Sequence, residues 1–406
     1  MYKFVKSPNE LSSFNIIFDG SCLREEKGTF GFSHLIEHLV AGKLKKFENK
    51  FNEYGVVYNA ATSNTRICYF ISGLDEGVCK FKKTLIDIVK NGLKDLTKEA
   101  LEAEKQIVLN ELSLDMLQPI SAHLELLGRK KFGFTAPAGI AEDIKNATVE
   151  SVQNFAWNVV QASPQLVIDI SSTPYKFSKE IRSAWMLDED EYDNSGTFWN
   201  GKKKKDVPTD DFCTSFWGNN SSVIASFKVN YADIPYMKLA AHVLGDGLSS
   251  PLYDEIRNKR NLAYYVHSFV YPLAENIGVF LVITDVNKDA ELATIETIEK
   301  ILTNPKKYIK FSRFKSICKA IEAKEKIKHI HMVDNPLLVI DNPNSLSALI
   351  RKHKDNEELL FKKMLVVMSK VIEDTIKNIS TYNGNKEYEK NMSSLADILA
   401  KAQASK

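Results

Sequence analysis

Two histidines lie four residues apart in the segment His34–His38 and enclose Glu37. On a helix, residues four apart project from one face, one turn from each other, so both rings can bind a single metal ion. Glu37 lies on the same face, where a carboxylate can take a proton from a metal-activated water and pass it to a leaving amine. The HxxEH pattern therefore predicts a zinc-dependent peptidase. Two ordinary core histidines on a buried helix are the alternative.

A catalytic zinc commonly has three protein ligands and a water, so the two histidines need a third partner. The segment 97–117 begins with a capping threonine and early glutamates, which predicts a long helix. Glu104 and Glu111 lie two turns apart on one face of this helix, which can therefore supply the missing ligand. Because the helix also carries Glu99 and Glu102, a solvated acidic face is the alternative.

The elements around these residues mix strands and helices without regular alternation, which predicts an α+β fold rather than a doubly wound sheet. Apolar spacing and glycine stops predict helices, whereas β-branched and aromatic residues predict strands. The segment 56–74 is either a strand pair or one long bent strand. The expected helices cover residues 34–40, 44–55, 81–93, 97–117 and 147–160, and the expected strands cover 14–23, 56–74 and 165–171.

A charged stretch with Gly and Pro but no apolar period, residues 188–211, predicts a linker between two halves of similar size. We expect an N-terminal zinc-binding domain over residues 1–190, a linker over 191–210 and a C-terminal domain over 211–406. The sequence from His38 can be laid beside the sequence from His242: a helix, a Gly, an amphipathic helix and then a strand. This faint similarity suggests two related α+β domains, of which only the first carries a metal motif.

Composition narrows the function classes. A net charge of +2 gives no electrostatic reason to expect nucleic acid or an acidic membrane surface as a partner. No window has the roughly 18 uninterrupted apolar residues of a membrane span, and the N-terminus does not resemble a signal peptide. The five cysteines are scattered and form no CxxC pair, which favours reduced thiols and, by default, a cytoplasmic location.

The stretch GTFGFSHLIEHLV, followed by EKQIVLNEL, resembles the pitrilysin family of insulin-degrading enzyme and mitochondrial processing peptidase. The segments FDGSCLREEK, GVVYNAATS and APAGIAEDIKNATVESVQNF extend the resemblance across the first half. It implies two related domains, each a mostly antiparallel sheet packed with helices. It further implies one Zn²⁺ per chain bound by His34, His38 and Glu111, with Glu37 as general base. Glu104 matches the family's second carboxylate, which we expect to act behind the ligands.

The resemblance also implies how a substrate is held. The residues Asn59, Ala60, Ala61 and Thr62 match an edge strand to which an extended peptide adds as a further strand. In the second half, LGDGLSSPLYDEIRNKRNLAYYVHS resembles a segment whose Arg and Tyr reach the active site, and Arg257 and Tyr264 occupy those positions. They would hold substrate and stabilise a developing oxyanion. A shift of register by one residue would place Tyr265 there instead.

Taken with the resemblance, these residues predict a zinc metalloendopeptidase acting on peptides or unfolded segments. A two-domain chain resembles half of the family's larger shell, so we expect a homodimer or a heterodimer with a homologous chain. A non-catalytic scaffold or a peptide-binding subunit of such a heterodimer is the competing function.

Overall fold

The computed structural model describes residues 1–7, 10–19, 22–115, 137–159, 164–185, 187, 210–217, 220–274, 277–326 and 346–379. The chain divides into two compact units, and each is described by itself. The first comprises residues 1–115, 124–205 and 320–348, and the second comprises residues 116–123, 206–319 and 349–406. Apart from Asp210, the predicted linker over 191–210 lies outside the described residues, so its bounds stay a prediction.

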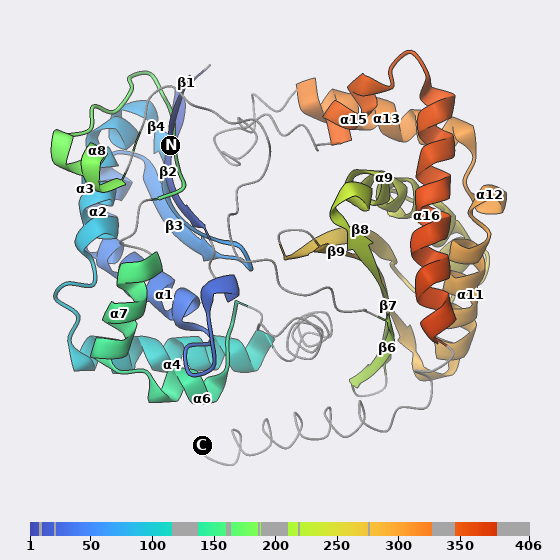
Figure 1. Ribbon diagram of the computed structural model, residues 1–406, viewed down its shortest axis with the longest axis horizontal. Coiled ribbons are helices and arrows are strands. Elements are labelled where there is room, and N and C mark those ends of the chain that lie inside the picture. Colours follow the sequence, from blue (N-terminus) through green and yellow to red (C-terminus); the bar gives the residue numbers. More distant parts are fainter. Residues whose placement is uncertain are drawn as a thin grey trace. The chain divides into compact units, whose positions relative to one another are not determined.

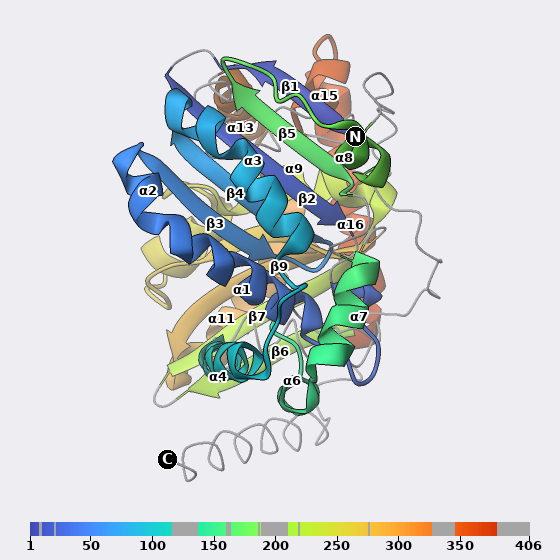
Figure 2. The ribbon, with the colours of Figure 1, turned by 90° about the vertical axis from the view of Figure 1, so that its left-hand side faces the viewer.

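The first unit is built on a five-stranded sheet (Figure 1), and its strand order β1-β5-β2-β4-β3 can be followed in Figure 2. Only the β1–β5 pair is parallel, and β3 forms one open edge. The segment predicted as a strand pair or a bent strand is the antiparallel pair of β3 and β4. The strands are β1 (Tyr2–Lys6), β2 (Leu11–Asp19), β3 (Val56–Thr62), β4 (Arg66–Leu74) and β5 (Leu166–Ser171).

Helices α1 and α3 cover one face of this sheet (Figure 2). Strand β5, which lies between β1 and β2, is buried along its whole length, whereas β4 mostly alternates between buried and half-buried residues, as a strand packed on one face does. Helix α3 meets the sheet through apolar residues at helical spacing, such as Val78, Phe81 and Leu85. The helices are α1 (Phe32–Leu44), α2 (Glu48–Glu53), α3 (Asp75–Asn91), α4 (Lys98–Asp115), α6 (Ala141–Asn146), α7 (Val149–Val159) and α8 (Lys179–Trp185).

The second unit contains an antiparallel sheet in the order β6-β7-β9-β8, covered by α9, α11 and α16. The strands are β6 (Asp210–Trp217), β7 (Asn220–Asn230), β8 (His267–Ala274) and β9 (Ile277–Asn287). The helices are α9 (Ile234–Gly245), α10 (Pro251–Tyr253), a π-helical turn (Asp254–Asn258), α11 (Glu291–Thr303), α12 (Pro305–Tyr308) and α16 (Glu357–Ile379). The residues of α13 (Phe311–Lys326) and α15 (Leu346–Lys352) are divided between the two units.

The two sheets share a topology, which confirms the predicted α+β fold with two related halves. In the first unit, β2 leads into α1, short helical turns, the β3–β4 pair and α3. In the second, β7 leads into α9, short helical turns, the β8–β9 pair and α11. The strand orders β5-β2-β4-β3 and β6-β7-β9-β8 correspond, except that β5 follows its partners in the chain and β6 precedes them.

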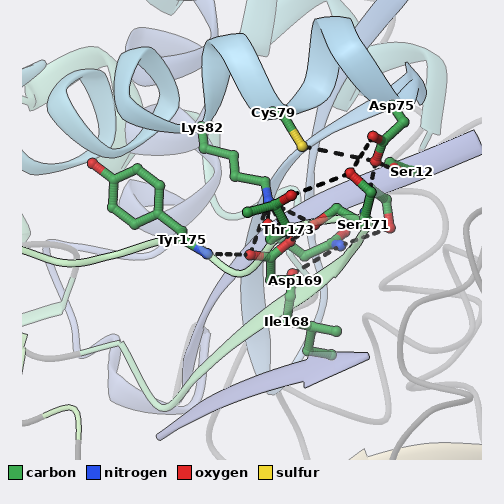
Figure 3. A network of polar contacts seen from close by, with 12 residues as sticks. Ser12, Asp75, Cys79, Lys82, Ile168, Asp169, Ser171, Thr173 and Tyr175 are labelled. Carbon is green, nitrogen blue, oxygen red and sulfur yellow. Dashed lines mark hydrogen bonds and ion pairs between the residues drawn. The ribbon is translucent and has the colours of Figure 1, made fainter. Parts of the chain in front are cut away.

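A buried ion pair links α3 to β5 (Figure 3). Lys82 Nζ lies 2.7 Å from Asp169 Oδ1, and both side chains are almost fully buried. The ammonium also donates to Ser171 Oγ and Thr173 O, so its three protons have acceptors. Asp169 accepts a hydrogen bond from the Tyr2 hydroxyl, and burial together with this carboxylate raises the pKa of Tyr2. The network thus fixes β1, β5 and α3 to one another.

A second carboxylate, that of Asp75 at the start of α3, accepts hydrogen bonds from β2 and from the residue directly after β5 (Figure 3). Asp75 accepts hydrogen bonds from Ser12 Oγ and from the backbone N–H of Ser172. Partial burial alone would raise the pKa of Asp75, but these hydrogen bonds, with others from Ser172 Oγ and Cys79 Sγ, lower it below its usual value.

Within the described part of the chain, none of the helices combines the length and hydrophobicity that a bilayer span requires.

Candidate metal centre

Helix α1, which carries the HxxEH residues, is capped by a carboxylate from the preceding loop. Its N-cap residue is Gly31, in the left-handed region with φ +97°, and it has no side chain with which to cap the helix. Instead, Glu25 accepts hydrogen bonds from the backbone N–H groups of Gly31 (2.8 Å) and Ser33 (2.7 Å). Asp143 in α6 likewise accepts from the N–H of Phe30. These two carboxylates hold the turn directly before His34.

The predicted ligands lie together between α1 and α4. His34 Nε2 and His38 Nε2 are 3.1 Å apart, and Glu111 Oε2 lies 3.5 Å from the first and 3.3 Å from the second. Two histidines four apart on α1 thus meet a glutamate from α4, as the helix-face argument requires. In the part of the chain that the structure describes, this is the one group of three metal-ligating side chains with its donor atoms so close.

The donor set fits zinc. With bonds of about 2.0–2.2 Å, the ligands of a tetrahedral ion lie roughly 3.3–3.6 Å apart, close to the triangle seen here. Glu104 Oε2 lies 3.5 Å from His38 Nδ1, so it can hold the proton on that nitrogen and leave Nε2 for a metal. His34 Nδ1 is buried and has no hydrogen-bond partner among the described residues. Burial, and then the neighbouring His38, lowers the pKa of His34 to about 4, which keeps the ring in the neutral form that binds metals.

Glu37 lies beside the triangle on the same helix. Its carboxylate is 4.0 Å from His34 Nε2 and accepts a hydrogen bond of 3.3 Å from Thr62 Oγ1 in β3. The residue is only 9% exposed, and burial raises the pKa of Glu37. A carboxylate with a raised pKa is a stronger proton acceptor than an ordinary surface glutamate, as a general base needs to be.

The predicted substrate residues form the end of the open edge strand β3. Asn59 and Ala61 are exposed, whereas Ala60 and Thr62 are half-buried on the face that meets α1. The N–H of Ala60 is bonded to the Asn59 side chain (2.9 Å) and not to β4. Thr62 therefore places the end of this edge beside Glu37, and one N–H of the edge is already bonded to the Asn59 side chain.

Arg257 and Tyr264 contact each other in the second unit. The Arg257 guanidinium lies 4.5 Å from the centre of the Tyr264 ring, a cation–π contact, and 4.9 Å from that of Tyr253. Tyr264 is 77% exposed, whereas the Tyr265 hydroxyl donates to Asp285. Of the two tyrosines, Tyr264 is therefore the one whose side chain is available for another role. Because this pair and the metal ligands belong to different units, the joint site stays a prediction.

Two residues with a link to the site were not among the predicted ones. Glu25 caps α1 from six residues before Gly31, and a carboxylate at that distance belongs to no short capping motif. Tyr69 in β4 is fully buried, and burial, followed by the charge of Glu37, raises the pKa of Tyr69. In the sequence Tyr69 is one of several aromatic residues of a strand, with no signal to distinguish it.

The donor triangle on two helices, the adjacent glutamate and the duplicated α+β fold together define an HxxEH metallopeptidase-like protein. Comparison with known families supports this class. Residues 4–127 match the model of the insulinase family, peptidase family M16, and residues 203–311 match that of the peptidase M16 inactive domain. The two matches together span more than half of the chain. The chain belongs to the M16, or pitrilysin, family.

Individual relatives are distant. A Bacillus subtilis protein named uncharacterized zinc protease YmxG is 23% identical over 349 residues, covering 81% of each chain. A protease from Helicobacter pylori has a similar fold, with a TM-score of 0.62, 17% identity and coverage of 94% of this chain and 93% of that one. An M16 inactive domain from Pseudomonas fluorescens gives a TM-score of 0.64 at 15% identity, covering 91% and 92%. At these identities the structural matches establish the fold alone.

Proposed function

We propose that this protein is a zinc-dependent metalloendopeptidase that cleaves peptides or unfolded protein segments. The observation that carries the proposal is the triangle of His34, His38 and Glu111 donor atoms with the Glu37 carboxylate beside it. A bound zinc ion, one per chain, would polarise a scissile carbonyl and acidify a water. A resemblance to proteins named zinc proteases supports the same reaction class.

The protein's own residues divide the remaining work. Glu37 takes the proton of the attacking water and delivers it to the leaving amine. Glu104 holds the His38 ring in one tautomer through Nδ1. The open edge of β3 receives an extended peptide through its backbone, which favours unfolded segments over folded proteins. Arg257 and Tyr264 of the second unit are proposed to provide cationic and hydroxyl donors to the substrate.

A non-catalytic role is the second candidate, because the second half matches a model described as the M16 inactive domain. A scaffold or peptide-binding subunit would keep the fold without needing a metal. Such a role does not require the His34, His38 and Glu111 donor atoms to lie 3.1–3.5 Å apart, or a buried carboxylate to lie beside them. We therefore favour the peptidase. A homodimer, or a heterodimer with a homologous chain, is the proposed assembly, and its mass in solution tests this.

Zinc content and cleavage of an unstructured fluorogenic peptide test the function. Wild type and Glu37→Gln should both bind one zinc per chain, because Glu37 is not a ligand, but only wild type should cleave. A chelator should abolish the wild-type activity, and added zinc should restore it. Zinc-free native protein, or equal cleavage by Glu37→Gln, would refute the mechanism.

The tyrosine assignment has its own matched pair. Tyr264→Phe should lower turnover without loss of zinc, whereas Tyr265→Phe should act mainly on stability through its bond to Asp285. An unchanged rate in Tyr264→Phe would remove that residue from the site.

A further inference from the structure

Thr62 is the residue at which the open edge strand meets the general base. Along β3, burial alternates, and Thr62 follows Tyr58 and Ala60 on the side of the sheet that contacts α1. Its Oγ1 lies 3.3 Å from Glu37 Oε2. Among the described residues, the Thr62 hydroxyl is the one group that donates a hydrogen bond to this carboxylate. The Thr62 side chain therefore faces the catalytic helix and not a peptide at the edge.

The backbone N–H and C=O of Thr62 point in a different direction, toward the open edge of the sheet. Beyond the end of β3, the Ser63 N–H donates to Arg66 O across the turn into β4. In an antiparallel ladder the residues that face the partner alternate with residues that face away. The backbone groups of Thr62 and Ala60 therefore point to the open edge, in agreement with the bond between the Ala60 N–H and the Asn59 side chain.

We propose that Thr62 is a positioning residue, whose hydroxyl orients Glu37 while its backbone forms part of the edge that receives the peptide. The inference rests on the proposed function and deepens it, because it links peptide docking to the orientation of the base. At 3.3 Å the bond is long for an O–H···O contact, for which about 2.7–2.8 Å is usual. A peptide strand paired to this edge fixes the Thr62 backbone, which holds the hydroxyl against the carboxylate and shortens the bond.

Three variants distinguish the effect of the Thr62 hydroxyl from the effect of changing a side chain on the strand. Thr62→Val keeps the size and the β-branching and removes the hydroxyl, whereas Thr62→Ser keeps the hydroxyl. Val57→Thr makes the reverse exchange at an exposed position of the same strand and serves as the control. In Thr62→Val we expect kcat to fall about ten-fold, the low end for losing a hydrogen bond to a charged group, with KM and zinc content unchanged. Thr62→Ser should retain most of the kcat that Thr62→Val loses, and Val57→Thr should not reproduce that loss.

Three kinetic outcomes would overturn the proposal. An unchanged kcat in Thr62→Val, or an equal loss in Thr62→Ser, overturns the proposal. A rise in KM alone assigns the hydroxyl to substrate binding and overturns it as well.

Crystal structures of the metal-free variants provide a readout that does not need activity. The Glu37 carboxylate should leave its wild-type position in Thr62→Val and keep it in Thr62→Ser. An unmoved carboxylate in Thr62→Val refutes the inference, even if zinc-loaded wild type proves inactive. That inactivity by itself would refute only the proposed function.

Discussion

Replacing Glu25 by Gln should loosen the start of the helix that carries the two proposed histidine ligands. Glu25 is 2% exposed, and its two oxygens accept from the N–H groups of Gly31 and Ser33. A glutamine side chain can accept one of these bonds through its oxygen, but it turns an NH₂ group toward the other N–H. One buried donor of the first turn then faces another donor and loses its partner.

The size of the effect follows from this geometry. A hydrogen bond to a charged group is worth about 1.5–3 kcal/mol, and favourable charge at a helix N-terminus adds roughly 0.3–1 kcal/mol. We expect Glu25→Gln to lower the free energy of unfolding by about 2–4 kcal/mol. For a unit of this size each kcal/mol shifts Tm by roughly 2–4 °C, so the first unit should melt about 5–15 °C lower. Because His34 follows Ser33 directly, zinc affinity should fall by roughly ten- to hundred-fold.

Thermal and urea unfolding, followed by a zinc competition titration with a chelator, measure both effects. Glu26→Gln is the matched control, since Glu26 is exposed and the same exchange there should cost less than about 0.5 kcal/mol. If Glu25→Gln melts with the control, the two short bonds to Glu25 do not stabilise the helix, and the capping argument fails. If the protein is destabilised but zinc affinity is unchanged, the cap does not position the ligands.

Three further changes test the networks around the site. Lys82→Met should cost roughly 3–5 kcal/mol in urea unfolding, because it leaves the buried Asp169 without its cation; a loss below 1 kcal/mol contradicts this. Hydrogen bonds that outweigh partial burial hold the pKa of Asp75 below its usual value, so its contribution is present at neutral pH and disappears in acid. The wild-type advantage over Asp75→Asn should therefore shrink as pH falls below about 4, and an advantage that is constant with pH rules this out. Tyr265→Phe should cost about 1–2 kcal/mol by removing the bond to Asp285, whereas unchanged unfolding would show that the bond is not formed.

Much of the fold, and the grouping of side chains at the candidate metal centre, could be predicted because their signals are local. The HxxEH residues share one face of a helix, and the two glutamates share one face of a later helix, so helical periodicity alone groups both sets of side chains. From the residues alone, either Glu104 or Glu111 could complete the site. In the structure Glu111 lies against both Nε2 atoms, whereas Glu104 lies against His38 Nδ1. The α+β class likewise followed from periodicity and turn residues.

Two features that were not predicted depend on the folding of segments outside any local pattern. Strand β1 was not expected, because the strand that pairs with it in the described sheet is the parallel β5, more than 150 residues further along the chain. Its short run from Tyr2 to Lys6 carries no alternating pattern. Glu25 was missed for a related reason: it is one of two consecutive glutamates, and only the folded loop shows which of them turns inward. Local periodicity predicts neither the pairing of β1 with β5 nor the burial of Glu25 in place of Glu26.

The bond between the Asn59 side chain and the Ala60 N–H has a consequence for solubility. An open edge strand with unpaired donors is a template on which a second copy can pair, and sheets with such edges tend to aggregate. By covering one donor of β3 with its own amide oxygen, Asn59 makes spontaneous pairing less favourable without closing the edge permanently. Any strand that pairs there must first displace this oxygen. The same contact therefore disfavours self-association through this edge, and it adds the cost of displacing the Asn59 oxygen to the binding of any peptide strand there.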